Sequence, residues 1–180
     1  MLHFFFSRVT EIVEEQGGRV QEFRGDGILA LWDNADGVTA GRALEAAKML
    51  QASLSDRLLP AEALRGLEPL ALGVGIEQGP VLIGSIGLAH RRSYTVLGDT
   101  VSVALRIQEM TAELAQPILL GECIARQLSD ARLESQGSYL LSGLRIPHTL
   151  FAPAPSGSIS APAFEAGEGP NLAVVSGGKS

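Results

Sequence analysis

An acidic residue between two glycines, Gly25-Asp26-Gly27, separates two short runs of the chain that could pair as strands. Glycines on both sides permit the positive φ angles of a tight turn, so the Asp26 carboxylate can project from the end of such a pair. A carboxylate there can bind a hard cation such as Mg²⁺, which takes its remaining ligands from water and phosphate. The alternative is an ordinary turn aspartate that hydrogen-bonds its own backbone.

A basic residue, Arg106, is the second candidate for chemistry. It lies on a different face from the apolar residues Val101, Ala104 and Leu105, which recur at helical spacing. A guanidinium on such a face can bind a phosphate through two parallel hydrogen bonds. The alternative is a solvated surface arginine. The glycine-rich segment 75–84 lacks the GxxxxGK[ST] pattern and is not a P-loop.

Hydrophobic periodicity predicts the elements that carry these residues. Apolar residues at three- and four-residue spacing predict helices over residues 2–16, 40–54, 99–108 and 122–128, the third capped by Asp99-Thr100. Alternating or continuous apolar runs predict strands over residues 19–24, 28–32, 70–76, 81–83, 93–98, 117–120 and 142–151. Turn residues at 25–27 and 79–80 make hairpins of 19–32 and 70–83. Hairpins mixed with helices indicate an α+β fold with a mostly antiparallel sheet.

The composition excludes several classes of protein. The chain has 180 residues, which is room for one domain with a core. A formal net charge of −6 argues against nucleic acid or anionic lipid as a partner. A single cysteine, Cys123, excludes an internal disulfide framework and a cysteine-built zinc site. No apolar run approaches the ~18 residues of a membrane span, so we expect a cytoplasmic domain over residues 1–153. The Pro-, Gly-, Ser- and Ala-rich residues 154–180 are expected to form a flexible tail.

In the order and spacing of four segments, the chain resembles the catalytic domain of the class III adenylate and guanylate cyclases. The segments are GGRVQEFRGDGILALW, LALGVGIEQGPVLIGSIG, RRSYTVLGDTVSVALRIQ and LSGLRIPHTLF. The resemblance implies a ferredoxin-like α+β sandwich that dimerises head to tail, with sites shared across the interface. It implies conversion of ATP or GTP to a cyclic 3′,5′-nucleotide and pyrophosphate in intracellular signal transduction. The implied cofactor is Mg²⁺ or Mn²⁺, held by two aspartates.

The resemblance also assigns roles to individual residues. Asp26 matches the second metal-binding aspartate, and Arg106 matches the arginine that stabilises charge in the transition state. Thr95 and Glu22 match two positions that read the base. Threonine at the position of Thr95 is usual in adenylate cyclases, whereas glutamate at the position of Glu22 is typical of guanylate cyclases. Ser102 stands where the family has an asparagine that positions the ribose. The partner is either a second copy of this chain or another cyclase domain.

Three departures from the family pattern bear on activity. The first metal-binding aspartate belongs to a strand that precedes the first helix, and this chain begins after it, so we expect that strand to be missing from the middle of the sheet. Ser102 has a shorter reach than asparagine, and Ser142-Gly143 replaces a common Lys-Gly. We therefore expect this chain to be a poor catalyst.

Two further interpretations stay open. One is a catalytically degenerate cyclase-like module that dimerises with or regulates an intact partner. The other starts from the segment FRGDGILAL, which weakly resembles the acidic hairpin of diguanylate cyclases. That segment lacks their Gly-Gly-Asp-Glu-Phe signature.

Overall fold

The structure of the chain is a computed structural model. It describes residues 2–25, 27–33, 36–55, 71–88, 91–129, 131–155 and 171–176. Asp26 therefore lies outside the described residues, and so does Leu70, the first residue of the strand that we predicted over 70–76.

The described residues form four helices and nine strands. The helices are α1 (Leu2–Glu15), α2 (Gly37–Ser55), α3 (Asp99–Glu113) and α4 (Glu122–Ala125). The strands are β1 (Arg19–Arg24), β2 (Gly27–Trp32), β3 (Gly73–Gln78), β4 (Leu82–Leu88), β5 (Arg91–Leu97), β6 (Ile118–Leu120), β7 (Leu133–Tyr139), β8 (His148–Pro153) and β9 (Asn171–Ser176). None of the helices that the structure describes is long and apolar enough to cross a membrane.

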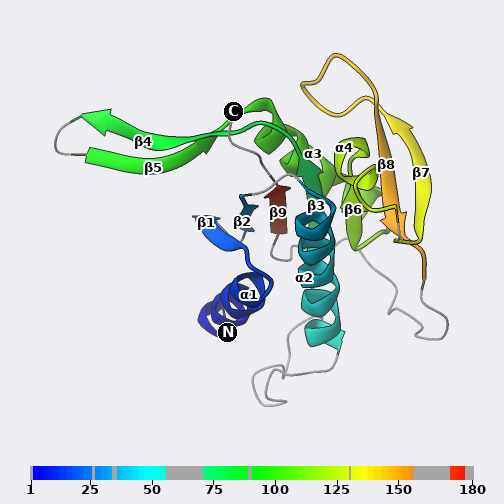
Figure 1. Cartoon of the computed structure of the whole chain (residues 1–180), viewed down its shortest axis with the longest axis horizontal. Helices are drawn as coiled ribbons and strands as arrows, with labels where there is room; N and C mark the ends of the chain where they lie inside the picture. Colours follow the sequence, from blue (N-terminus) through cyan, green and yellow to red (C-terminus); the bar gives the residue numbers. More distant parts are fainter. Residues whose placement is uncertain are drawn as a thin grey trace.

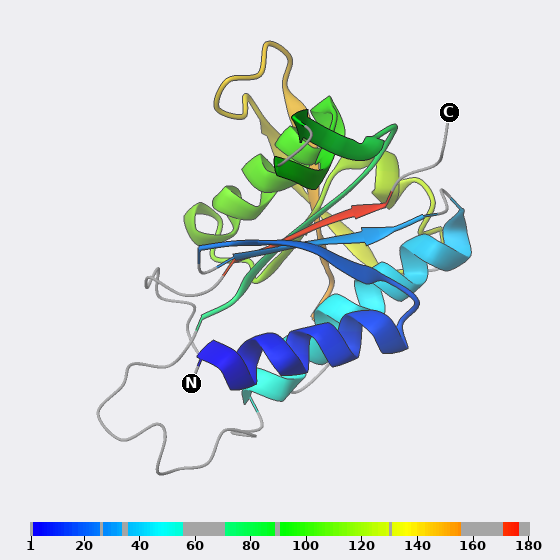
Figure 2. The ribbon, with the colours of Figure 1, turned by 90° about the vertical axis from the view of Figure 1, so that its left-hand side faces the viewer.

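Seven strands form one sheet in the order β1-β2-β9-β3-β6-β8-β7. The pairings at its two ends are antiparallel, whereas β9 runs parallel to both β2 and β3, and β3 runs parallel to β6. Helices α1 and α2 cover one face and α3 covers the other, as Figure 2 shows. The predicted α+β architecture is confirmed, but the centre of the sheet is parallel where we expected antiparallel strands.

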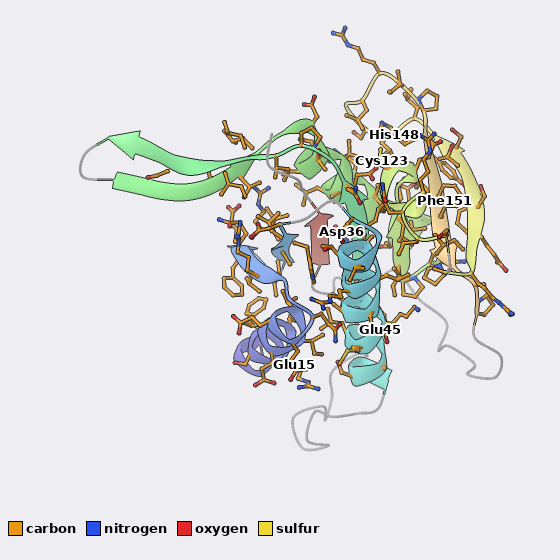
Figure 3. All side chains as sticks on the ribbon, viewed as in Figure 1. Glu15, Asp36, Glu45, Cys123, His148 and Phe151 are labelled. Carbon is orange, nitrogen blue, oxygen red and sulfur yellow. The ribbon has the colours of Figure 1, made fainter. Side chains whose placement is uncertain are left out.

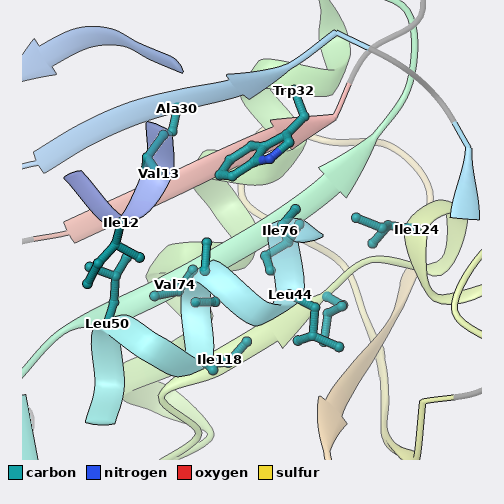
Figure 4. Packing of buried hydrophobic residues seen from close by; sticks show 14 of the residues in the cluster. Ile12, Val13, Ala30, Trp32, Leu44, Leu50, Val74, Ile76, Ile118 and Ile124 are labelled. Carbon is teal, nitrogen blue, oxygen red and sulfur yellow. The ribbon is translucent and has the colours of Figure 1, made fainter. Parts of the chain in front are cut away.

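Strand β2 shows why the sheet is covered on both faces. Its alternate residues Ile28, Ala30 and Trp32 are buried in the core cluster that α1 and α2 share with the sheet (Figure 4). The residues between them, Leu29 and Leu31, are buried in a second cluster on the other face. A strand that is apolar on both faces must lie inside a layered structure, because each face needs its own cover.

Strands β4 and β5 form a separate two-stranded ribbon that projects from the body of the molecule (Figure 1). We predicted that residues 81–83 would fold back on 70–76, but that hairpin is wrong: β3 pairs with β6 and β9, and β4 pairs with β5 over seven residues. Apolar alternation identifies a strand but does not identify its partner, because many partners satisfy the same period.

The expected gap in the middle of the sheet is filled from the other end of the chain. Residues 171–176, which we expected to belong to a flexible tail, form β9 between β2 and β3 (Figure 1). The Pro- and Gly-rich composition around this segment hid a run of apolar residues, Leu172 to Val175, that is long enough for one short strand.

Candidate functional site

Helix α3 carries two of the predicted site residues, and its start is fixed by its contact with the chain before β4. We predicted Asp99-Thr100 as the cap, but the helix is preceded by Gly98, at φ 150°, and no side chain caps it. The Thr100 hydroxyl instead donates to the carbonyl of Pro80 at 3.0 Å. This bond ties the first turn of α3 to the segment where the chain leaves β3 for the ribbon.

Helix α3 lies directly against β3 because two strand positions lack side chains. A Cβ on Gly75 would overlap the backbone nitrogen of Gln108 and lie 2.5 Å from the carbonyl oxygen of Ala104. A Cβ on Gly73 would overlap the hydroxyl of Thr111. These glycines therefore set the distance between the helix and the sheet, and with it the position of every residue on the outer face of α3.

The outer face of α3 carries Ser102, Arg106, Glu109 and Glu113, which follow one another at three- and four-residue spacing. Ser102 is exposed and Arg106 is half-buried. The Arg106 guanidinium donates through Nη1 to both carboxylate oxygens of Glu109, at 2.6 and 2.8 Å. This hydrogen bond, together with the negative charge of Glu109, raises the pKa of Arg106 above its usual value.

A cavity of about 280 Å³ opens beside this face of α3. Its lining comes from α3 and from the end of β7 with the residues after it: Arg106, Glu109, Met110, Glu113, Tyr139, Leu140, Leu141 and Ser142. The structure thus brings Arg106 together with Ser142, the first residue of the Ser-Gly pair noted in the sequence. Sequence reasoning missed Glu109, although its spacing of three residues from Arg106 on a helix was the available signal.

The two predicted base-reading residues lie on other elements. Glu22 is half-buried on β1, and its carboxylate accepts a hydrogen bond from Nε of Arg24 at 2.9 Å. Thr95 is half-buried on β5, opposite Gly84 of β4. Strands β1 and β5 approach one another, so both residues lie on the side of the molecule from which the ribbon projects.

The predicted site residues therefore fall into two groups within one chain. Ser102 and Arg106 share α3, whereas Glu22 and Thr95 belong to β1 and β5. The recorded partners of Glu22 and Arg106 lie on their own elements. Asp26, predicted as a metal ligand, lies outside the described residues, although the strands beside it pair as far as Arg24 and Gly27.

The described residues do not by themselves fit a divalent metal ion. Among the residues that the structure describes, no group of three or more His, Cys, Asp or Glu side chains could hold a metal. A metal-binding role for Asp26 therefore stays a prediction.

A buried carboxyl group, which sequence reasoning also missed, lies at the end of β3. Glu77 is 5% exposed, and its Oε1 accepts hydrogen bonds from the backbone nitrogens of Gln78, at 2.8 Å, and Ile124, at 3.4 Å. Gly121 lies so close that a Cβ there would overlap the carboxyl group. Burial raises the pKa of Glu77 to about 7, against the opposing effect of the two backbone donors.

The cysteine beside this carboxyl group is not an activated nucleophile. Cys123 lies on α4, next to β8 in Figure 3, and is exposed. Partial burial and then the neighbouring Glu77 raise the pKa of its thiol. A raised pKa leaves less of the reactive thiolate at neutral pH.

Comparison with known proteins identifies the family. The model of the adenylate and guanylate cyclase catalytic domain matches residues 2–151. An adenylate cyclase of Anabaena cylindrica is 35% identical over 131 residues, which are 71% of this chain and 26% of that protein. Adenylate cyclase 1 of Rhizobium meliloti (strain 1021) is 30% identical over 132 residues, which are 72% of this chain and 20% of that protein. The chain thus spans about a quarter or a fifth of the length of these relatives.

Solved structures agree with this family. The crystal structure of the guanylyl cyclase Cya2 superimposes with a TM-score of 0.72 at 27% identity, covering 91% of this chain and 83% of that one. The adenylyl cyclase CyaB from P. aeruginosa superimposes with a TM-score of 0.67 at 16% identity, covering 89% and 83%, and so shares the fold. With a family match over most of its length and relatives at this identity, the chain belongs to the family of adenylate and guanylate cyclase catalytic domains.

Proposed function

We propose that this chain forms a cyclic 3′,5′-nucleotide and pyrophosphate from ATP or GTP at a low rate, in a site that two copies share. The observation that carries the proposal is the outer face of α3, where Ser102 lies one turn before Arg106 and Arg106 lines a cavity. A guanidinium on a partly exposed helix face can bind phosphate oxygens and stabilise the charge that develops as pyrophosphate leaves.

The division of the site residues within one chain supports a shared site. Arg106 and Ser102 would face the triphosphate and ribose held by the partner copy, whose Glu22 and Thr95 would contact the base. The Ser102 hydroxyl would donate one hydrogen bond to the ribose. Asp26 would hold a divalent ion, which supplies charge neutralisation at the phosphates and takes its other ligands from water and phosphate oxygens.

The projecting ribbon supports dimerisation. A two-stranded ribbon is marginally stable by itself, so β4 and β5 need a surface to pack on. At its base, the cross-strand neighbours Leu82 and Leu97 are 70% and 47% exposed. A second copy of the chain would cover these leucines and bring the two groups of site residues together.

The test is nucleotide turnover by the purified chain with ATP or GTP and Mn²⁺. We expect Arg106→Ala to lower kcat by about 100- to 1,000-fold, as loss of a preorganised charge-stabilising donor does. The matched control is Arg8→Ala on α1, where a half-buried arginine pairs with Glu11 in the same i,i+3 geometry. An Arg106→Ala enzyme as active as the control would contradict the proposal.

The second candidate function is a degenerate module that binds a cyclase partner without turnover. The specific observation in its favour is Ser102, which replaces an amide with a shorter hydroxyl on an exposed position of α3. A chain that forms dimers and binds the triphosphate but yields no cyclic product with either nucleotide would establish this alternative. A Ser102→Asn variant that gains turnover would locate the cause at that residue.

A further inference from the structure

In the part of the chain that the structure describes, strand β9 joins two parts of the sheet that share no other ladder. On one side it pairs with β2 over five residues, from Ile28↔Leu172 to Trp32↔Ser176. On the other side it pairs with β3 over six residues, from Gly73↔Asn171 to Gln78↔Ser176. Strands β2 and β3 are not neighbours in the sheet, so among the described strands β9 alone links the ladder of β1 and β2 to the ladder of β3, β6, β8 and β7.

The gap that β9 fills is enclosed by the rest of the fold. Helix α2 contacts β9 from one face of the sheet and α3 contacts it from the other. The strands on either side bury apolar residues next to it: Ala30 and Leu29 of β2 and Val74 and Ile76 of β3 are 0% exposed. An unfilled gap would leave the inner edges of both strands without hydrogen-bond partners in a dry interior, which is costly for each backbone group.

On its N-terminal side, the segment that fills the gap is joined to β8 through residues 156–170. The described chain stops at Pro155 after β8, and β9 begins at Asn171. Residues 156–170 can span at most about 50 Å, whereas the β8 and β9 positions are separated by two intervening strands, or roughly 15 Å. Fifteen residues are thus more than enough to cover this distance, and the ladders with β2 and β3 are what hold the strand in its place.

From this arrangement we propose that the gap between β2 and β3 is a binding site for one extended peptide strand, and that residues 171–176 occupy it as a tethered ligand. The site takes an apolar segment of about six residues that runs parallel to both neighbours. It contains no proline, because both backbone edges of a central strand donate and accept. Since a tether of this length gives an effective concentration in the millimolar range, the same segment supplied at that concentration competes for the site.

The experiment uses the full chain with Val174→Pro, which removes a backbone N–H from the middle of β9. The matched control is Val174→Ala, which shortens the same side chain and keeps the N–H. We expect amide hydrogen exchange in β2 and β3 to become about 10- to 100-fold faster in the proline variant than in the alanine variant. A peptide of residues 169–178, added at millimolar concentration, is expected to restore slow exchange, and the same peptide with proline at position 174 is not.

Each outcome decides the proposal. Equal exchange in the two variants would overturn it, because β9 would then not hold the ladders. Faster exchange that the peptide does not reverse would also overturn it, because the strand would be no exchangeable ligand. If the proline variant does not fold, the unaltered chain gives the answer: excess isotopically distinct peptide should release residues 171–176 to fast exchange while β2 and β3 stay protected. If millimolar peptide failed to release residues 171–176, that result would refute the binding site.

Discussion

Arg106 is bound to a carboxylate of its own helix before any phosphate reaches it. Glu109 holds the guanidinium through both of its oxygens, and both side chains are 41–52% exposed. An exposed ion pair of this kind is weak. Glu109 therefore holds the guanidinium at the cavity, and it would compete with the proposed triphosphate substrate for the guanidinium.

We predict that Glu109→Gln lowers the KM for the nucleotide about threefold, because the phosphate no longer displaces a carboxylate. Steady-state kinetics checks this. Glu113→Gln is the control, since Glu113 lines the same cavity. A KM that changes equally in both variants would show only the loss of one negative charge near the site.

The buried Glu77 predicts how stability depends on pH. Its pKa is raised from 4.5 to about 7 in the folded chain, so the folded state binds more protons than the unfolded state between these values. The free energy of unfolding should therefore fall as the pH rises from about 4.5 to 7, by on the order of 3 kcal/mol in total. Chemical denaturation at a series of pH values measures this directly.

The variant Glu77→Gln should abolish most of that pH dependence, leaving stability similar at pH 5 and higher than the parent at pH 8. Glu122→Gln is the matched control, because Glu122 is half-buried on α4 and contributes only a secondary charge effect to Glu77. A Glu77→Gln profile parallel to that of the parent would show that another group titrates.

At the scale of elements, the contact between α3 and β3 depends on Gly75. An added methyl group would overlap the helix backbone at Gln108, and a backbone cannot rotate away as a side chain can. We predict that Gly75→Ala lowers the free energy of unfolding by about 3 kcal/mol. Gly41→Ala in α2, where nothing lies within 4 Å, should raise it by up to ~1 kcal/mol instead. Urea denaturation measures the free energy of unfolding of both variants. Equal changes in Gly75→Ala and Gly41→Ala would refute the close contact between α3 and β3.

The local elements could be predicted from sequence because their signals are local. The turn glycines around Asp26 and the apolar run after them predicted β1 and β2 correctly, and helical spacing predicted α1, α2 and α3. Strand β7 was missed because its residues, LESQGSY, are mostly polar and half-buried or exposed, so they carry no apolar alternation. Its identity as a strand comes from its pairing with β8.

The pairing of strands and the assembly of the site could not be predicted in the same way. No repeating pattern in the sequence indicates that β4 pairs with β5 or that β9 inserts between β2 and β3. Both depend on which strand edges are free once the helices pack. For the site, helical spacing placed Ser102 and Arg106 on one helix, and the cavity and Glu109 came from the structure. The roles of Glu22, Thr95 and Asp26 stay predictions.

For the whole molecule, the exposed leucines of the ribbon predict how copies associate. We expect Leu82→Glu to weaken the proposed dimer at least tenfold, because dimerisation would then bury a carboxylate in place of a leucine. Sedimentation at several protein concentrations measures this, with Val38→Glu as the control. Val38 is 69% exposed, as Leu82 is at 70%, but it lies on α2 and not on the ribbon. A dimer that tolerates both changes equally would place the interface elsewhere.

The central position of β9 also governs the order of events as the chain is made. Ile28 and Leu172 lie side by side although nearly the whole sequence separates them. Contacts of such long range form slowly, because a large loop must close before they contribute. The hairpin of β1 and β2 is synthesised well before β9, yet the inner edge of β2 has to wait for β9 before it is paired. Nascent chains halted before residue 171 should therefore depend on chaperones to keep that edge from pairing with other chains.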